Sequence, residues 1–338
     1  MIKNDFNDKF WTLGNGQDFI KWSNEDIEVG NYDTSLFESY DKELDTLVQK
    51  WLDDDEFGAI MQSLHHSNNE ELPPSYLDFR ESYESIPSWV NSDLITSGSE
   101  LSERSGLIGL LVLRNFALLG GYNFANLTKP LVATGALEKG AVNRLTYTLD
   151  FWVNVSRTDK DAQQRRINAC IRTRLVHCAS RIMINKKEPN WEVEKYGIPI
   201  NHADMVATNI AFTVYFLYGL SELKFNYSEQ EEEGIFHLWK YVTYMLGVPL
   251  DIIPSNKKEA LEFFKFWMQY QNKPDEDSIK LTNALLDENT PISLLKLDIV
   301  KRNMGYIHRS VSNFLLAGRT PAHLHLPPVR FPNLIPHA

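Results

Sequence analysis

Cysteine and positive charge are both scarce in this chain of 338 residues. Two cysteines exclude a disulfide-stabilised scaffold and a metal site made from four thiolates. Cys170 and Cys178 should lie on one helix about 12 Å apart, too far for a disulfide, so we expect both to be reduced. Thirty-four basic residues against forty-five acidic ones give a net charge of -11, which argues against nucleic acid and anionic membrane surfaces as partners.

Long hydrophobic runs are missing as well. The most apolar stretches, 106–121 and 205–220, are each about 16 residues long and are interrupted by polar side chains. A membrane-spanning helix needs about 20 mostly apolar residues, so we expect buried helices and no transmembrane segment. The first residues, Met1 to Phe6, contain no apolar stretch of the kind found in a signal peptide. The expected location is therefore the cytoplasm.

Several common catalytic motifs are also absent. Without a G-x-S-x-G elbow, a P-loop or a G-x-G-x-x-G turn, hydrolase, NTPase and dinucleotide-binding functions have no support. Glu233 and His237 are four residues apart and together are able to bind a metal from one helix, but the paired E-x-x-H helices of a di-iron centre are missing. His202 is another candidate ligand, although its place near an expected helix start favours a hydrogen-bonding role.

Helical periodicity, by contrast, runs through most of the chain and predicts an all-α fold. The organisation that we expect is an N-terminal arm over residues 1–40, a single helical domain over 41–319, and a proline-rich irregular tail over 320–338. Within the domain, the apolar spacing predicts helices over 41–64, 103–119, 123–134, 136–158, 159–186, 202–221, 228–247, 256–271, 276–287 and 291–316.

Local signals mark several helix ends. Ser228 and Glu231 have the spacing of a capping box. The helix that they open should end at Gly247, since a glycine followed by Pro249 is typical of a helix C-terminus. Thr290-Pro291 has the form of an N-cap with proline at the first helical position, and Pro73-Pro74 should open a short helix. Residues 191–200 are the one segment predicted to hold a short strand or hairpin.

The segment from Ile171 to Arg181 contains the strongest candidates for ligand-binding side chains. At 100° per residue, Arg174 and Arg181 project within roughly 60° of His177. An apolar stripe that should face the core lies beside them; it consists of Ile171, Leu175, Cys178 and Ile182. Two arginines near a core need a compensating anion. A haem would provide iron for the imidazole and two propionates for the guanidinium groups.

A structural interpretation of the same three residues stays open. A single histidine on a helix often has only a structural hydrogen-bonding role, and Arg174 and Arg181 would be equally well compensated by acids on a neighbouring helix.

The helix before this segment holds a second group of polar residues, in the sequence from Asn143 to Trp152. Arg144 and Thr148 are four residues apart, and Tyr147 and Phe151 share that face. A cation, a hydroxyl and a phenol next to aromatic side chains would suit the distal side of an oxygen-binding pocket. The structural alternative is that Arg144 pairs with Asp150 or another acid and that Thr148 bonds within its own helix.

Together these segments resemble the latex-clearing rubber oxygenases and the related MpaB-type oxygenases. The family pattern is R-L-x-x-T, matched here by 144–148, followed about thirty residues later by a helical histidine flanked by arginine, matched by 174–181. Residues 197–205 are similar to the family's G-x-P-I-N-x-x-D/E segment, and 231–249 are similar to its E-x-x-x-x-H-L-W-R-Y block ending in L-G-V-P. The resemblance covers about residues 70–255.

This resemblance implies a globin-like helical core that binds one b-type haem. By analogy, His177 is the proximal iron ligand, Arg174 and Arg181 hold the propionates, and Arg144 and Thr148 line or brace the haem pocket. Members of the family use O2 to cleave a carbon–carbon double bond in polyisoprene or in a prenyl side chain. The partners implied here are O2 and an apolar small molecule.

The chain departs from the family pattern at one informative position. Some latex-clearing members have a lysine directly before the threonine of the first motif, where this chain has Tyr147. A phenol is able to donate a hydrogen bond to bound O2 or, as phenolate, to bind iron. The distal glutamate that serves as base in those members has no match here, and the expected cytoplasmic location favours a lipid-like alkene smaller than polyisoprene.

We therefore expect a haem b-dependent oxygenase that cleaves or oxidises a double bond in an isoprenoid or lipid-like substrate. One alternative is a haem-binding or haem-sensing protein without turnover. Another is a helical scaffold that has lost haem, in which case Arg174 and Arg181 should be paired with acids of the protein itself.

Overall fold

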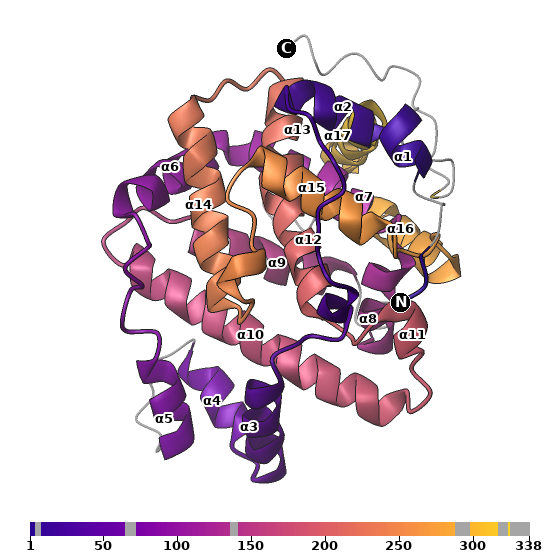
Figure 1. The fold of residues 1–338 in the computed structure, drawn as a ribbon. Coiled ribbons are helices and arrows are strands. Elements are labelled where there is room, and N and C mark those ends of the chain that lie inside the picture. The colour runs from indigo at the N-terminus through magenta and orange to yellow at the C-terminus, as the bar shows by residue number, and fades with distance from the viewer. Residues whose placement is uncertain (4–7, 65–71, 136–140, 288–297, 317–323, 325–338) are drawn as a thin grey trace.

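The computed structural model describes residues 1–3, 8–64, 72–135, 141–287, 298–316 and 324, and all regular structure in those ranges is helical. This confirms the predicted all-α fold. The α-helices, shown in Figure 1, are α1 (Asp8–Leu13), α2 (Asn15–Ser23), α3 (Lys42–Asp53), α4 (Phe57–Ser63), α5 (Pro74–Glu81), α6 (Ser92–Val112), α7 (Leu119–Gly121), α8 (Ala125–Ala133), α9 (Ala141–Val155), α10 (Ala162–Lys187), α11 (Val193–Tyr196), α12 (His202–Ile210), α13 (Phe216–Glu222), α14 (Glu229–Met245), α15 (Lys257–Met268), α16 (Glu276–Asp287) and α17 (Asp298–Leu316).

Four shorter turns of other helix types join these elements. Two are 3-10 helices, η1 (Thr34–Phe37) and η4 (Leu250–Ile252). Two are π-helical, η2 (Leu113–Leu118) between α6 and α7 and η3 (Ala211–Tyr215) between α12 and α13. The π-helical turns pack against each other, with the rings of Phe116 and Tyr215 4.7 Å apart.

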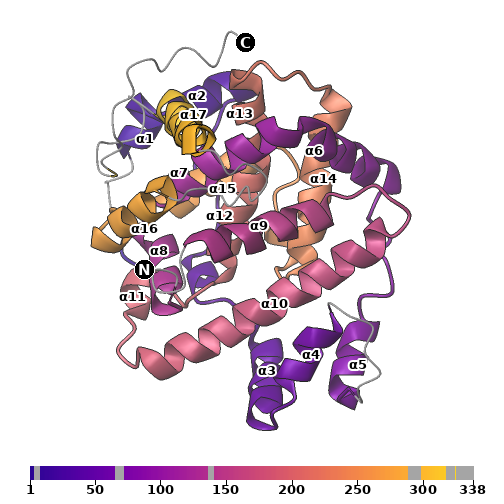
Figure 2. The same cartoon turned by 180° about the vertical axis from the view of Figure 1, so that it is seen from behind.

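Helix α10 divides the molecule. Figures 1 and 2 show α3, α4 and α5 on one side of it, and α9, α12 and α14 on the other. The predicted apolar stripe of α10 is buried, from Ile171 to Ile182. Because α10 has neighbours on both sides, its polar residues are also able to meet partners from distant parts of the chain.

The helix-end signals give a mixed outcome. Ser228 and Glu231 form the predicted capping box, and Pro74 opens α5. Gly247 follows the end of α14 with a φ of 91°, the left-handed conformation that glycine tolerates. The predicted strand or hairpin at 191–200 is wrong: residues 193–196 form α11 through local hydrogen bonds, and the backbone N–H of Ile198 donates to the carbonyl of Phe37. Thr290-Pro291 lies outside the described residues.

The apolar stretch 205–220 is largely buried, as expected for a core helix, and 106–121 is buried in part, with Leu107 64% exposed. Residues His202–Glu222, which comprise α12, η3 and α13, are long and apolar enough to cross a membrane. Of the 18-residue apolar window in this stretch, 83% is buried inside the protein. The helix pair Ser92–Gly121 and Ala125–Ala133 meets the same test only when taken together across a 97° bend. Aromatic rings fill much of the interior, including Phe212 stacked on Trp239 at 4.0 Å.

Helices α6 and α14 cross at a point where two glycines meet. A Cβ on Gly98 would lie 2.3 Å from the carbonyl oxygen of Gly234, so neither position has room for a side chain. This close approach fixes how α14 crosses α6.

The N-terminal arm is partly helical and is attached to the domain. Phe19 of α2 and Phe37 of η1 are fully buried, and the backbone of Gly30 donates a hydrogen bond to the carbonyl of Glu262 at 3.0 Å. The domain boundaries at 40/41 and 319/320 stay predictions. The predicted tail lies outside the described residues except for Leu324, which is buried.

Candidate functional site

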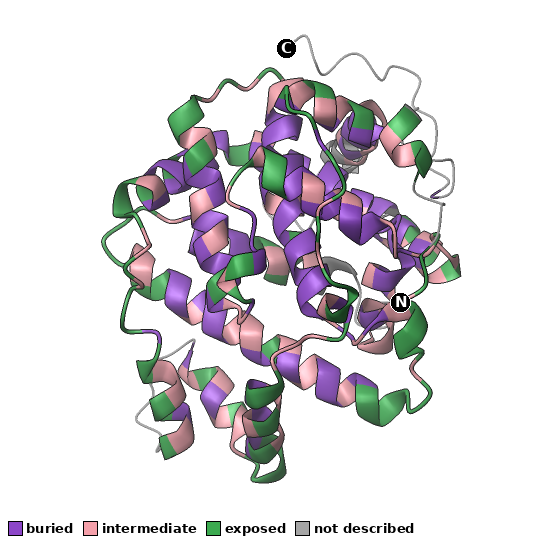
Figure 3. Cartoon of the chain, viewed as in Figure 1, coloured by how far each residue is buried: buried purple, intermediate pink, exposed green. Residues whose placement is uncertain are grey.

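Helix α10 carries three of the predicted site residues: Arg174, His177 and Arg181. Figure 3 shows buried, half-buried and exposed residues alternating along this helix. Cys170 and Cys178 lie on the same helix and are free and buried, as predicted. The partners of the two arginines, described next, come from the start of α3, from the turn after α5 and from the turn before α12.

His177 is half-buried, and its Nδ1 atom is buried without a hydrogen-bond partner among the described residues. The pKa of His177 is lowered to about 4, first by burial and then by the nearby Arg181 charge, while Asp41 opposes the shift. The imidazole is therefore neutral at neutral pH. A neutral imidazole with unshared nitrogen electrons is the form that binds a metal ion.

Arg174 forms an ion pair with Asp41, the residue that precedes α3. Its Nε and Nη2 atoms donate to the two carboxylate oxygens of Asp41 at 2.6 and 3.1 Å. The remaining nitrogen, Nη1, donates to the Tyr83 hydroxyl at 2.8 Å, and that hydroxyl donates to the carbonyl of Met245 at 2.8 Å. Such a two-pronged pair is the strongest geometry for arginine and a carboxylate.

Arg181 forms an equivalent pair one turn into α3. Its Nε and Nη2 atoms donate to Asp45 at 2.9 and 2.7 Å, and Nη1 donates to the carbonyl of Ile200 at 3.0 Å. The Arg181 side chain is only 2% exposed. We call the four residues Asp41, Asp45, Arg174 and Arg181 the α3–α10 clasp.

His202 borders the clasp from the start of α12. Its Nδ1 shares a 2.9 Å hydrogen bond with the Ser39 hydroxyl, and its backbone N–H donates to the Ser39 carbonyl at 2.8 Å. The Nε2 atom is buried without a partner among the described residues, and burial lowers the pKa of His202 to about 4. The hydrogen-bonding role that the sequence favoured for His202 is thus observed at one of its two nitrogens.

Because of the clasp, these residues fit the iron of a haem but not its propionates. The neutral His177 imidazole, with its unpartnered nitrogen, fits an iron ligand. Arg174 and Arg181 do not fit propionate ligands in this arrangement, because all three nitrogens of each guanidinium already donate to protein groups. The open alternative, pairing with acids on a neighbouring helix, is what the structure shows.

Helix α9 places the predicted distal residues in more open surroundings. Tyr147 is 69% exposed and Thr148 is half-buried, while Phe151, predicted to share their face, is buried against Trp239. The side chain of Arg144 lies outside the described residues. Asp150, offered above as a partner for Arg144, forms an ion pair with Arg172 of α10, so α9 and α10 are linked directly.

The histidine of the E-x-x-x-H pair has a structural role. His237 accepts a hydrogen bond at Nε2 from the backbone N–H of Asn91 at 2.8 Å, just before α6 begins. Across the described residues, no group of three or more histidine, cysteine or acidic side chains has metal-binding geometry.

The G-x-P-I-N-x-x-D segment builds the start of α12. The Asn201 side chain accepts from the backbone N–H of Asp204 at 2.9 Å as an N-cap, and it also donates to the Asp204 carboxylate at 2.8 Å. The Trp267 indole donates to the other carboxylate oxygen at 2.8 Å. Burial raises the pKa of Asp204 to about 7, although both hydrogen bonds oppose the shift.

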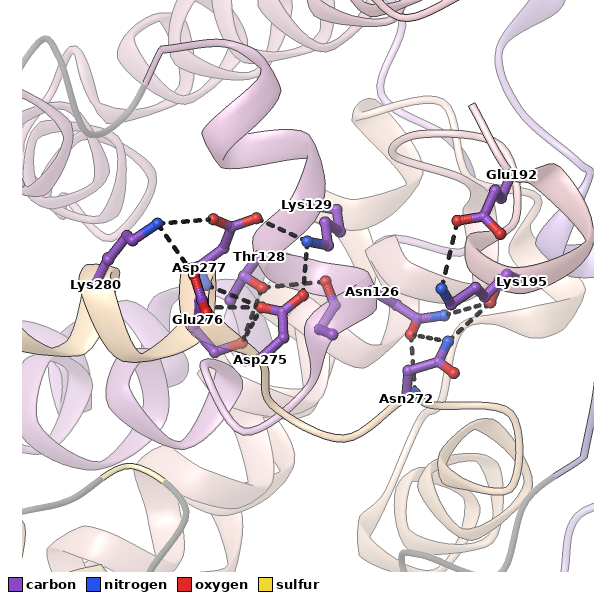
Figure 4. Close-up of polar contacts among 12 residues, drawn as sticks. Asn126, Thr128, Lys129, Glu192, Lys195, Asn272, Asp275, Glu276, Asp277 and Lys280 are labelled. Carbon is purple, nitrogen blue, oxygen red and sulfur yellow. Dashed lines mark hydrogen bonds and ion pairs between the residues drawn. The ribbon is translucent and has the colours of Figure 1, made fainter. Parts of the chain in front are cut away.

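A second polar cluster, drawn in Figure 4, joins α8 to the start of α16. Lys129 pairs with Asp275 at 2.6 Å and with Asp277 at 2.7 Å. Burial acts against the charged amine, but the hydrogen bonds that it donates to the two carboxylates outweigh this effect and raise the pKa of Lys129. Asp275 also accepts from the backbone of Asp277 and Ser278 as the cap of α16. This cluster is therefore a link between helices.

With this geometry in view, comparison with known proteins identifies the family. The family described as "ER-bound oxygenase mpaB/B'/Rubber oxygenase, catalytic domain" matches residues 110–333, more than half of the chain. The chain belongs to this family, which confirms the resemblance found in the sequence.

Two relatives show how far the likeness extends. The rubber oxygenase of Streptomyces sp. (strain K30) is 24% identical over an alignment of 230 residues, and the match covers 64% of this chain and 55% of the relative. The chain thus spans little more than half of that protein's length. The solved structure of latex clearing protein LCP in the closed state matches with a TM-score of 0.73 and 19% identity, covering 90% of this chain and 82% of the other. At that identity, the match establishes the fold.

Sequence reasoning did not find half of the clasp. Asp41 and Asp45 lie 133 and 136 residues before their arginine partners. Their one sequence signal is a spacing of four residues at the start of a helix, which equally describes acids that stabilise a helix N-terminus. Tyr83, which borders the clasp, carries no separate signal, and Gly247 is marked in the sequence only as a helix end.

Proposed function

We propose that this protein is an oxygenase that uses O2 to cleave or oxidise a carbon–carbon double bond in an apolar, isoprenoid or lipid-like substrate. We further propose that it binds b-type haem through His177. Membership of the oxygenase family supports the reaction class. The observation that carries the haem assignment is the neutral imidazole of His177, whose Nδ1 atom has no hydrogen-bond partner among the described residues. By the sequence resemblance, His177 corresponds to the family's proximal histidine.

The protein groups around His177 would set its properties as a ligand. The lowered pKa keeps the ring neutral across the cellular pH range, so no proton competes with a metal for it. When bound, a haem would supply the iron at which O2 is activated. The buried stripe of α10 would hold the His177 helix in place while the half-buried ring stays reachable.

Helix α9 would provide the polar groups on the substrate side. In this proposal, the Tyr147 phenol donates a hydrogen bond to an oxygen atom, and Arg144 and Thr148 brace the same side. The 69% exposure of Tyr147 leaves its hydroxyl free to turn toward a substrate that binds over α9. The catalytic roles of these three residues stay predictions.

Haem content tests the ligand assignment. The protein is expressed with a haem precursor, and a pyridine haemochrome assay counts haem per chain. We expect about one haem per chain, and His177→Ala should lose most of it. His237→Ala is the matched control, because His237 bonds to the backbone of Asn91 and should leave haem content unchanged. Equal haem in wild type and His177→Ala, with both folded by circular dichroism, would refute the assignment.

Oxygen uptake then separates the oxygenase from its alternatives. Consumption of O2 with a polyprenyl compound supports the oxygenase. Haem without uptake supports a haem-binding or haem-sensing protein. Absence of haem after reconstitution supports a helical scaffold, an alternative favoured by the pairing of Arg174 and Arg181 with protein acids. Cell fractionation would test the predicted cytoplasmic location, and the expected lack of nucleic-acid binding follows from the net charge of -11.

A further inference from the structure

The arginines on either side of His177 are enclosed by protein on several sides. The Arg174 guanidinium lies 5.7 Å from the centre of the Phe79 ring, and the Arg181 guanidinium lies 5.5 Å from that of Tyr40. In both cases the Nε and Nη2 edge, the edge that best matches a carboxylate, is occupied by an aspartate.

The turn after α14 is shaped to fit the Asp41–Arg174 pair. A Cβ on Gly247 would lie 2.7 Å from Arg174 Nε and 2.8 Å from Asp41 Oδ2. The backbone of this turn therefore packs directly on the pair. Tyr83, held by the Met245 carbonyl, contacts Arg174 from another side. A bound carboxylate would have to displace Asp41 from a closely packed environment.

We propose that Asp41 and Asp45 are positioning residues for His177: they hold Arg174 and Arg181 against α3, and the carboxylates of a bound haem are held elsewhere. His177 stands one turn after Arg174 and one turn before Arg181, so anchoring both arginines fixes the rotation of α10 about its axis. The imidazole direction is set by that rotation. The cofactor part of this proposal rests on the proposed function, whereas the clasp itself does not.

Stability of the haem-free protein tests the clasp alone. Asp41→Asn, Arg174→Gln and the double variant are compared by thermal unfolding, with Arg172→Gln as a control because Arg172 faces Asp150 of α9. We expect each single variant to lower Tm by about 3–8 °C, and the double variant to lose clearly less than the sum, since both changes remove the same pair. Additive losses, or no loss, would overturn the clasp.

A pair of probes tests where the haem carboxylates bind. Hemin and hemin dimethyl ester differ only in whether the two propionates are free. The ratio of their dissociation constants is measured in wild type, Arg174→Gln and Arg172→Gln. We expect the same ratio within about threefold in all three proteins. If the ratio of the two dissociation constants falls toward one in Arg174→Gln and not in Arg172→Gln, Arg174 holds a propionate and the proposal is overturned.

The Soret band tests positioning as distinct from general stability. We expect Asp41→Asn to shift or broaden the Soret band of the hemin-loaded protein, because His177 loses its fixed direction, and Arg172→Gln to leave the band unchanged. An unshifted band in Asp41→Asn would refute the positioning role. If hemin binds to none of the proteins, the proposed function fails, while the unfolding experiment still decides the clasp.

Discussion

Helix α10 contains a buried arginine near each end, and the two charges are compensated in different ways. Arg166, near the start, is 3% exposed and donates to the carbonyls of Val155 and Arg157 and to side chains of Gln163 and Ser99. Arg181, near the end, is 1% exposed and donates to the carboxylate of Asp45. Both are fully buried cations on one helix, yet only one of them has a carboxylate partner among the described residues.

The difference comes from how far away each partner lies in the chain. Val155 is 11 residues from Arg166, and its carbonyl belongs to the end of α9, where a helix leaves unpaired carbonyls and a partial negative charge. Asp45 is 136 residues from Arg181 and reaches it only because α3 folds against α10. The first end of α10 is stabilised mainly by groups nearby in the chain, with Ser99 of α6 as the exception, and the second end depends on a distant carboxylate.

Breaking the distant pair should have the largest effect. Asp45→Asn leaves the Arg181 guanidinium buried without a negative partner, so we expect the free energy of unfolding to fall by about 3–5 kcal/mol in urea denaturation. Asp150→Asn is the control, because the Asp150 side chain is 45% exposed and its pair with Arg172 should contribute about 1 kcal/mol or less. Equal losses in the two variants would contradict the distinction between the clasp and a surface pair.

Removing the local arginine should cost less. Arg166→Met eliminates the charge together with its hydrogen bonds, and it leaves the carbonyl of the fully buried Val155 without that donor. We therefore expect a loss of about 1–3 kcal/mol in the same denaturation experiment. A loss greater than that of Asp45→Asn would mean that the local end of α10 is the more important one.

Buried histidines should make stability depend on pH. Burial lowers the pKa of His177, His202 and His308 to about 4 in the folded state, against about 6.5 when unfolded. Between these values the unfolded chain binds more protons, so each histidine lowers stability as pH falls from 6.5 to 4, by up to about 1.4 kcal/mol per pH unit. Their contribution is fully present above pH 6.5.

Asp204 should act in the opposite direction. Its pKa is raised to about 7 in the folded state against 3.8 unfolded, so it lowers stability as pH rises from 3.8 to 7. Urea denaturation between pH 4 and 6.5 should therefore show a steeper pH dependence in Asp204→Asn than in wild type. An identical slope would mean that Asp204 stays ionised when buried.

Changing the exposed residue of α9 should affect stability least. Tyr147 is 69% exposed, so Tyr147→Phe should change the free energy of unfolding by no more than about 0.5 kcal/mol. If the phenol helps the reaction, O2 uptake with a polyprenyl compound should fall while haem content stays constant. Unchanged uptake would remove Tyr147 from the proposed catalytic residues.

The sequence alone was enough to predict the helical fold, the family and the shared face of α10. These properties follow from local patterns: the 3.6-residue spacing of apolar side chains, the capping box at Ser228, and the glycine–proline ending at Gly247. The error at 191–200 was also local, because residues 193–196 of this short segment rich in β-formers bonded to their neighbours and became α11.

Only the tertiary structure decided what Arg174 and Arg181 bind. Helical geometry placed both beside His177 and showed that they needed negative partners, but haem propionates and protein acids satisfy that need equally well. The choice depended on Asp41 and Asp45, whose distance along the chain hides them from any local pattern. The sequence therefore shows that the two arginines need negative partners, and only the folded structure shows that these partners are Asp41 and Asp45.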